Sequence, residues 1–201
     1  MPDSFGNWNS IYKRFNDWAH KGKLMTIFKS LIVEPDLEWE FIDGSVIKAH
    51  QHSSGAVKGQ ETAIGKSVAG NSTKIHMAVD SYGLPIEFEV AVGEVHDAKL
   101  APEFIAGLPD SDYKIADRGY DCEKLREQIK QQGSVPIIPR KKNSLQGNND
   151  IDWWLYKFRH LVENIFARLK DFRAIANRFD KLKRNYVDHL AMPCAFLWLP
   201  L

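Results

Sequence analysis

Residues 72–92 read STKIHMAVDSYGLPIEFEVAV and give the clearest indication of the chain's topology. Two segments within them, residues 72–80 and 86–92, are rich in the apolar and β-branched side chains typical of β-strands. The five residues between these segments include Gly83 and Pro85, which favour a tight turn. Residues 72–92 therefore predict two strands joined as an antiparallel hairpin.

Three shorter strands are predicted on either side of this hairpin. They are expected at residues 37–42, 112–116 and 135–138, the last despite Pro136. The first runs into Asp43 and Gly44, a pair that indicates a turn, and the second ends at Asp117. Residues 50–71, rich in Gly, Ser, His and Lys, have weak periodicity and are predicted to form a loop.

Helical periodicity marks most of the remaining sequence. Helices are expected at residues 7–31, from Asp97 to about 108, at 122–132, at about 152–178, and from about 184 to the end with a disturbance at Pro193. Three antiparallel strands, then alternating helices and strands, then a long helix predict an α/β fold. The order fits a ribonuclease H-like mixed sheet, three antiparallel strands and then parallel ones, flanked by helices.

The length of 201 residues suits one sizeable domain. Because Pro35 closes the first helical segment, we expect residues 1–35 to form a short helical prelude and residues 36–201 to form the folded domain. The apolar tail from residue 190 onward has about 12 residues, whereas a membrane-spanning helix needs roughly 20. The tail is therefore predicted to dock on the core, and no membrane partner is expected.

The charge is unevenly distributed along the chain. Residues 140–184 contain 12 Lys or Arg and 5 Asp or Glu, a local net charge of +7, so the remaining residues carry −6 within a total of +1. A basic segment beside an acidic body is typical of proteins that bind an anionic polymer such as nucleic acid. A solvated basic helix face would give the same count.

The cysteines and the N-terminus bear on localisation. Cys122 and Cys194 are the only cysteines and form no CxxC pair, which excludes a zinc ribbon or a disulfide scaffold. The first ten residues, MPDSFGNWNS, lack the basic-then-apolar pattern of a signal peptide. Both observations predict a cytoplasmic protein.

Three acidic residues stand out by their positions. Asp43 and Asp117 each follow a predicted apolar strand, and the carboxyl ends of sheet strands are where α/β folds place their sites. Glu163 lies inside the long predicted helix. If this helix packs along the sheet, its acid can reach the same edge.

The long helix presents a chemically distinctive edge. At about 100° per residue, Tyr156, Arg159, Glu163 and Lys170 fall within a sector of about 60°, beside a wider apolar face. An ordinary amphipathic helix with an internal Arg159–Glu163 salt bridge would explain the same pattern. The alternatives can be separated by whether this edge meets the other two acids.

The spacing Tyr156-x2-Arg159-x3-Glu163-x6-Lys170 resembles the signature around the third acid of bacterial insertion-sequence DDE transposases. Residues 42–45 (IDGS), 73–76 (TKIH) and 116–121 (ADRGYD) resemble other segments of this family, in the same order. The resemblance runs from about residue 5 to 199. The chain departs from the family pattern in two ways. Gly44 precedes Ser45 where a small hydroxyl residue is frequent, and the sequence starts after the N-terminal helical region that is usual in the family. Residues 1–35 are therefore expected to be a remnant of that DNA-binding region or a connector to it.

The resemblance implies catalysis by Asp43, Asp117 and Glu163, which would hold two Mg²⁺ ions, with Mn²⁺ as a substitute. Carboxylate oxygens suit Mg²⁺, and two ions about 3.5–4 Å apart can activate a nucleophile and neutralise the leaving oxygen. The implied reaction is cleavage of double-stranded DNA at the element ends, followed by attack of the freed 3′-hydroxyl on target DNA.

Six residues are predicted to contact DNA. The resemblance implies this role for the edge residues of the long helix, and the basic composition predicts it for three neighbouring residues, with a solvated loop as the alternative. The six are Tyr156, Arg159, Lys170, Arg140, Lys141 and Lys142.

Other functions remain open from the sequence. A nuclease of the same fold would cut without strand transfer, and a catalytically idle DNA-binding fragment would modulate a full-length transposase. A homodimer and an N-terminal region from an upstream reading frame are further partners to consider. Association with the bacterial nucleoid is expected in each case.

Several aromatic and histidine residues allow two interpretations. His50 and His52 suggest a metal-ligand pair, but a polar loop near the DNA is favoured because no Cys or third His lies nearby in the sequence. Trp153 and Trp154 can stack on an unpaired base or anchor a helix. His76 is expected to lie near the acids or to pack in the core.

Overall fold

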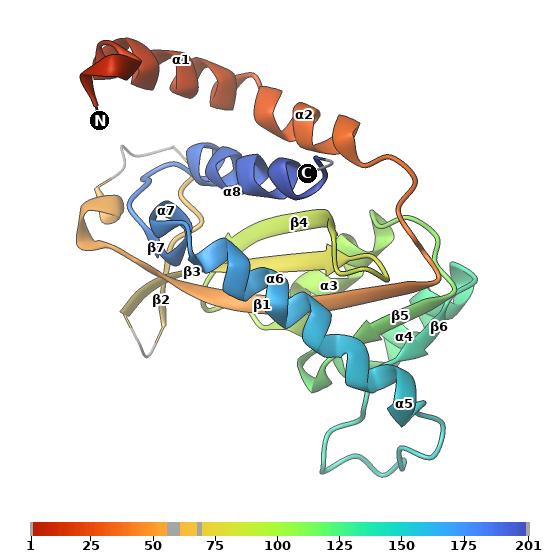
Figure 1. The fold of residues 1–201 in the computed structure, drawn as a ribbon. Coiled ribbons are helices and arrows are strands. Elements are labelled where there is room, and N and C mark those ends of the chain that lie inside the picture. Colours follow the sequence, from red (N-terminus) through yellow and green to blue (C-terminus); the bar gives the residue numbers. More distant parts are fainter. Residues whose placement is uncertain (1, 56–60, 68–69, 200–201) are drawn as a thin grey trace.

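The computed structural model describes residues 2–55, 61–67 and 70–199 (Figure 1). Its centre is a mixed seven-stranded sheet whose longest strands are antiparallel neighbours. The strands are β1 (Trp39–Ala49), β2 (Gly65–Ser67), β3 (Gly70–Val79), β4 (Pro85–Val92), β5 (Tyr113–Ala116), β6 (Val135–Ile137) and β7 (Asn177–Arg178). β4, β3 and β1 lie side by side and antiparallel, and β5 and β6 continue the sheet parallel to β1.

Helices cover both faces of the sheet (Figure 1). One face carries α6 (His160–Lys170) and α8 (Lys183–Leu197), with α1 (Trp8–His20) and α2 (Lys23–Leu31) packed outside α8. The other face carries α3 (Asp97–Ala106) and α4 (Glu123–Gln131). This arrangement confirms the ribonuclease H-like α/β fold predicted from the order of the elements.

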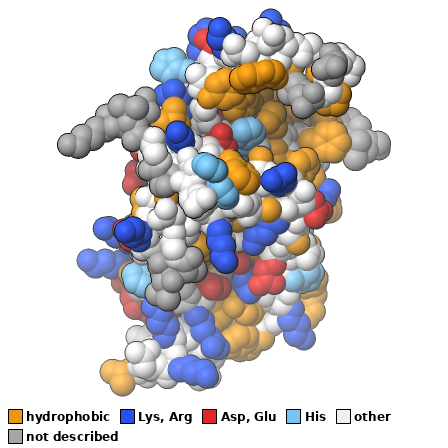
Figure 2. All heavy atoms as spheres, turned by 90° about the vertical axis from the view of Figure 1, so that its left-hand side faces the viewer, with side chains coloured by type: hydrophobic (Ala, Val, Ile, Leu, Met, Phe, Trp, Pro, Cys, Tyr) orange, Lys and Arg blue, Asp and Glu red, His pale blue; other side chains and the backbone are white. Residues whose placement is uncertain are grey.

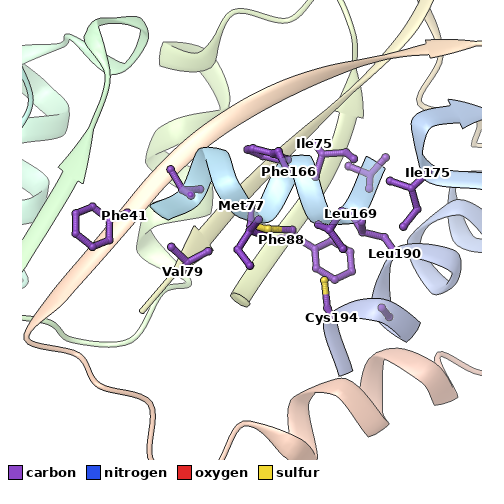
Figure 3. Packing of buried hydrophobic residues seen from close by; sticks show 14 of the residues in the cluster. Phe41, Ile75, Met77, Val79, Phe88, Phe166, Leu169, Ile175, Leu190 and Cys194 are labelled. Atoms are coloured by element: carbon purple, nitrogen blue, oxygen red, sulfur yellow. The ribbon is translucent and has the colours of Figure 1, made fainter. Parts of the chain in front are cut away.

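Strand periodicity divides the buried side chains into two cores. Phe41 and Ile47 of β1 point toward α6 and α8, whereas Ile42 points toward α3 and α4. Figure 3 shows the first core, in which Met77 and Phe88 from the sheet meet helix side chains such as Leu169, Leu190 and Cys194. Side chains alternate across a strand, so Asp43, two residues after Phe41, projects to the α6 side.

The hairpin prediction is confirmed, but the predicted turn at Asp43-Gly44 is wrong. β1 continues through both residues to Ala49, because residues 41–48 pair antiparallel with residues 72–79 of β3. Pairing along the whole of β3 outweighs the local turn preference of the Asp-Gly pair. Within residues 50–71, the predicted loop also holds a 3₁₀ turn at Gln51–Ser54, β2 and the start of β3. Residues 56–60 and 68–69 lie outside the described residues.

The long predicted helix is shorter than expected. It runs as α5 (Trp153–Tyr156), a 3₁₀ turn at Lys157–Arg159 and α6, which ends at Lys170. After α7 (Arg173–Ala176), the chain forms β7, where Arg178 is fully buried and donates to the Thr73 hydroxyl at 2.6 Å. This buried contact, together with pairing to the end of β1, holds the segment in extended form.

The remaining helices follow the predictions closely, with two local differences. The predicted helix at residues 7–31 is divided by Gly22, which has a φ of +60° and begins the second helix. The last helix continues through Pro193 without the expected interruption. Within the described residues, no helix has both the length and the apolar character required to cross a membrane.

Candidate active site

Asp43 lies in β1, and Asp117 directly follows β5, the parallel neighbour of β1. Ile42 of β1 pairs in register with Ala116 of β5, so the next residue of each chain segment is an aspartate at the same level. Glu163 reaches this edge from α6, which packs on β1. The sheet register and the helix packing thus bring three acids together from positions far apart in the sequence.

Arg159 shows how close two of these acids are. Its Nη1 donates to Asp43 Oδ2 at 2.9 Å, and its Nη2 donates to Glu163 Oε1. The internal Arg159–Glu163 salt bridge expected of an ordinary amphipathic helix is therefore present. The contact with Asp43 crosses from the helix to the sheet, which an ordinary amphipathic helix does not require. One cationic group is already shared by both carboxylates.

Burial and charge both act on Asp43. Burial raises the pKa of its carboxyl above the ordinary value, and the negative charges of Asp117 and Glu163 raise it further. The Gly44 N–H and the Arg159 guanidinium act against this rise. The three acids therefore repel one another electrostatically, and a bound cation would relieve that repulsion.

Each aspartate is fixed by the backbone beside it. Asp43 Oδ1 accepts from Gly44 N at 2.7 Å, and Asp117 Oδ1 accepts from Gly119 N at 2.7 Å. The second contact begins the 3₁₀ turn Arg118–Tyr120 that follows β5. One oxygen of each carboxylate is thus held by the backbone, and the other oxygen of Asp43 accepts from Arg159.

The donor set fits a hard divalent cation. Asp43, Asp117 and Glu163 offer only carboxylate oxygens, the ligands that Mg²⁺ and Mn²⁺ prefer. In their present positions, no three His, Cys, Asp or Glu side chains among the described residues surround a single point closely enough to hold a metal. Arg159 stands between Asp43 and Glu163, so cation binding requires this guanidinium to move.

The other residues of the helix edge lie beside the acids. Lys170 donates to the Ser45 hydroxyl at 2.9 Å, and Ser45 is two residues after Asp43 on the same strand face. The Arg159 guanidinium lies 5.9 Å from the centre of the half-buried Tyr156 ring. Tyr156, Arg159 and Lys170 therefore border the space at the acids.

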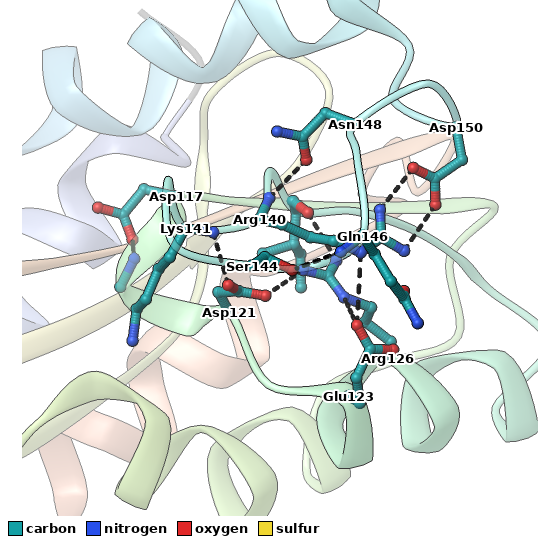
Figure 4. A network of polar contacts seen from close by, with 12 residues as sticks. Asp117, Asp121, Glu123, Arg126, Arg140, Lys141, Ser144, Gln146, Asn148 and Asp150 are labelled. Atoms are coloured by element: carbon teal, nitrogen blue, oxygen red, sulfur yellow. Dashed lines mark hydrogen bonds and ion pairs between the residues drawn. The ribbon is translucent and has the colours of Figure 1, made fainter.

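The loop that follows β6 contains Arg140, Lys141 and Lys142, which are predicted to contact DNA. The Arg140 guanidinium donates to both Asp150 oxygens, at 2.6 and 2.9 Å (Figure 4). Arg140 is only 8% exposed and also donates to the Gly147 carbonyl. It is thereby committed to ordering the loop. Lys141 and Lys142, by contrast, have exposed side chains.

Asp121 also has a role that the sequence did not indicate. Its carboxylate pairs with Arg126 and accepts from Lys141 N at 2.7 Å (Figure 4). These contacts tie the loop to the segment that follows Asp117. The partners are five and twenty residues away, so no local spacing pattern could reveal them.

The remaining candidate residues mostly pack against other rings. His50 stacks on His52 and on Phe179, with ring centroids 4.7 Å apart in both pairs. Trp154 makes edge contacts with Trp39 and Phe158, which favours helix anchoring, although its side chain remains 60% exposed.

A cluster of His76, Tyr120, Asp97 and Lys74 lies next to the two aspartates, and the sequence predicted only part of it. His76 is fully buried, and its Nδ1 lies 2.9 Å from the Tyr120 hydroxyl. Asp97 begins α3 as expected, but its carboxylate also pairs with Lys74 at 2.5 Å, beside His76. The TKIH and RGYD segments contain three of these residues, yet their mutual contact depends on strand pairing.

Positive side chains extend beyond the acids. Figure 2 shows Lys and Arg side chains spread over the face that lies to the left in Figure 1, where β1 meets β7. Exposed cations that belong to the elements in this region include Lys48, Lys170 and Arg173. This distribution fits an anionic polymer that passes beside the site.

Comparison with known proteins decides the family. The sequence profile described as "Transposase DDE domain" matches residues 41–198. This range covers most of the chain and contains all three acids. The chain belongs to the transposase DDE domain family. The resemblance to insertion-sequence transposases is thereby confirmed, and DNA is the partner that the family indicates.

Relatives of this DDE domain are named for insertion sequences. A Brucella ovis protein named as a transposase for element IS6501 is 33% identical over 132 residues, which are 64% of this chain and 98% of that protein. The IS1106 transposase of Neisseria meningitidis serogroup B is 28% identical over 60% of this chain and 44% of its own length. A Burkholderia cepacia protein named for IS402 is 25% identical, with 62% of each chain covered.

Among solved structures, the piggyBac transposase synaptic complex with hairpin DNA is similar to this chain with a TM-score of 0.37 and 13% identity. The match covers 55% of this chain and 24% of the piggyBac chain.

Proposed function

We propose that this DDE domain cleaves DNA at the ends of an insertion sequence and joins the freed 3′-hydroxyl to target DNA. The observation that carries the proposal is the convergence of Asp43 and Glu163 on one guanidinium, with Asp117 at the matching level of the adjacent strand. Three carboxylates from separate elements at one sheet edge suit divalent-cation chemistry on phosphodiesters.

Asp43, Asp117 and Glu163 would hold two Mg²⁺ ions, and Mn²⁺ would serve in their place. Bound there, the ions would supply a nucleophile deprotonated at neutral pH and neutralise charge on the leaving oxygen. The charges of Asp117 and Glu163 both raise the pKa of Asp43, so Asp43 lies close to each of them. It is therefore the acid that would contact both ions. No covalent bond between protein and DNA is part of this proposal.

The surrounding cations would hold the DNA. Arg159, once released from Asp43 and Glu163, can pair with a phosphate next to the cut, and Tyr156 can donate a hydrogen bond to the same strand. Lys170 would contact a flanking phosphate from the end of α6. Lys141 and Lys142 would reach the backbone from their exposed loop.

The experiment is incubation of the chain with double-stranded DNA that carries the element's own ends, with Mg²⁺, while cutting and joining are followed separately. We expect both products from the wild type. Asp43→Ala, Asp117→Ala and Glu163→Gln should each lower the cleavage rate by roughly 10³-fold, a size typical for loss of an essential electrostatic group. Thermal unfolding should stay cooperative in each variant.

Glu127→Gln is the matched control, because Glu127 is an exposed carboxylate on α4, away from the three acids. It should cleave like the wild type. Cutting without joining would instead identify a nuclease of the same fold. DNA binding with neither product would identify an idle fragment that modulates a full-length transposase. Unchanged cleavage by any one acid variant would remove that residue from the site.

A further inference from the structure

A fourth carboxylate lies behind the two aspartates of the site. Asp97 is the first residue of α3, on the opposite sheet face from α6, and its side chain is 21% exposed. Its Oδ1 pairs with Lys74 Nζ at 2.5 Å. Helix initiation alone does not explain why this carboxylate reaches the sheet.

Two glycines leave room for the Asp97 carboxylate. A Cβ atom added to Gly44 would lie 2.9 Å from Asp97 Oδ1, and one added to Gly119 would lie 2.9 Å from Asp97 Oδ2. Both distances are shorter than carbon and oxygen atoms tolerate without a shift. Asp97 is therefore wedged between Gly44 and Gly119, one oxygen against each.

These are the same glycines that orient the site. Gly44 donates its N–H to Asp43, and Gly119 donates its N–H to Asp117, each at 2.7 Å. The contacts therefore form a continuous path from Asp43 through Gly44, Asp97 and Gly119 to Asp117. A movement of the Asp97 carboxylate would be transmitted to both metal-binding aspartates.

Buried groups hold Asp97 in this position. His76, which pairs opposite Gly44 in the sheet, has its Nδ1 3.6 Å from Asp97 Oδ1. The same Nδ1 lies 2.9 Å from the hydroxyl of Tyr120, the residue after Gly119. His76 and Tyr120 are both fully buried, so the wedge rests on a rigid base.

We propose that Asp97 is a positioning residue, whose carboxylate between Gly44 and Gly119 sets the separation of Asp43 and Asp117 and thereby the affinity of the site for divalent cations. This inference rests on the proposed function of the three acids as cation ligands. Groups that orient metal ligands typically change metal affinity by about 10–100-fold when they are altered.

The test measures Mn²⁺ binding to the DNA-free chain by the electron paramagnetic resonance signal of free Mn²⁺. Two double variants separate shape from charge. The first, Asp97→Asn with Lys74→Met, keeps the size of residue 97. The second, Asp97→Ala with Lys74→Met, removes the side-chain group between Gly44 and Gly119. Both double variants remove one positive and one negative charge. We expect affinity within about 3-fold of wild type for the first and a loss of about 10-fold for the second.

Three further variants complete the design. Gly119→Ala keeps Asp97 but fills the space between it and Asp117, and it should also weaken Mn²⁺ binding. Glu103→Gln, an exposed carboxylate change on the same helix, should have no effect. Asp43→Ala defines the signal that is lost when the site itself is removed, and unfolding transitions confirm that each variant is folded.

The outcomes are distinct. Equal Mn²⁺ affinity for wild type and both double variants would overturn the positioning role, and so would equal weakening of both, which would indicate charge rather than shape. Wild-type affinity in Gly119→Ala would also contradict the wedge. If wild type binds Mn²⁺ no better than Asp43→Ala, the proposed function fails together with this inference.

Discussion

Arg159 is the residue whose contacts most sharply separate an ordinary helix from a catalytic one. Its salt bridge to Glu163 is what any amphipathic helix with this spacing would form. Its bond to Asp43, 116 residues earlier, joins that helix to the sheet at the point where the acids meet. In the proposed site, this guanidinium occupies the place of a cation and would contact a phosphate once displaced.

His76 makes a residue-level prediction about stability. The pKa of its imidazole is lowered from 6.5 to about 4, chiefly by burial; the Asp97 carboxylate opposes this change and the Lys74 ammonium adds to it. Tyr120, the other ring in contact, stays neutral because burial raises its pKa. The folded state therefore binds the His76 proton more weakly than the unfolded state between pH 6.5 and 4.

The contribution of neutral His76 to stability should accordingly be complete above pH 6.5 and be lost as the pH falls toward 4. The loss should be about 3 kcal/mol in the free energy of unfolding, from the size of the pKa change. Urea unfolding of the wild type and of His76→Gln between pH 6.5 and 4 gives the free energy of unfolding of each protein as a function of pH. The difference between these two curves measures the loss. Parallel curves would show that His76 does not titrate in this way.

Lys170 makes a second prediction at the level of one side chain. If it contacts a phosphate, Lys170→Ala should weaken DNA binding more at low salt than at high salt, because the contact releases a counterion. The slope of log affinity against log salt should fall by about 1. Lys13→Ala, an exposed lysine on α1, is the control and should leave the slope unchanged. An unchanged slope in Lys170→Ala would argue against a phosphate contact.

Asp43 lies in β1 and Asp117 directly follows β5, and a buried ion pair joins these two strands. Glu40 and Lys114 are register partners on these strands, both fully buried and bonded to each other. Lys114 also donates to the Pro109 carbonyl at 2.8 Å. Because this pair lies three residues before each aspartate, it fixes the level at which Asp43 and Asp117 meet.

Removal of one member should be worse than removal of both. Lys114→Met leaves the Glu40 carboxylate buried without its cation, and it should lower the free energy of unfolding by roughly 3–5 kcal/mol. The double variant Glu40→Gln with Lys114→Met should lose clearly less, since no buried charge remains. Denaturant unfolding compares the two. Equal stability of the single and double variants would mean that the pair is not an isolated buried charge pair.

Elements whose sequence signals lie within a few residues were predicted more accurately than elements held by distant contacts. The β3–β4 hairpin, β5 and α4 have their pattern and their end signals within a few residues, and all were predicted nearly correctly. The second half of β1 and the short β7 are held by pairing with distant strands, so local preferences misled. The ion pair of Arg140 with Asp150 likewise had no signal in the sequence, because it lies in a loop without periodicity.

The residues of the candidate site likewise include some that the sequence predicted and some that it did not. The helix spacing and the family resemblance predict Asp43, Asp117 and Glu163 as the acids of the site. The strand-end argument holds for Asp117, which follows β5, but not for Asp43, because β1 continues to Ala49. The role of Asp97 could not be predicted, because its contacts run through Gly44 and Gly119, which only the folded sheet brings together.

At the scale of the whole molecule, the two faces of the sheet contribute different residues to the site. The helices on the α6 face bring Glu163, Arg159 and Lys170 to the two aspartates. The opposite face of the sheet, covered by α3, holds Asp97 and its buried neighbours. The long strand β1 runs between these layers and carries Asp43 near its middle (Figure 1). The site therefore depends on the complete sheet with both its helical layers.

Crystals of the chain grown with Mn²⁺, with anomalous scattering measured at the manganese edge, test this account most directly. We expect Mn²⁺ between Asp43, Asp117 and Glu163, with the Arg159 guanidinium moved away from Asp43. Manganese bound only elsewhere, with Arg159 still bonded to both acids at saturating Mn²⁺, would contradict the claim that these three carboxylates form a cation site.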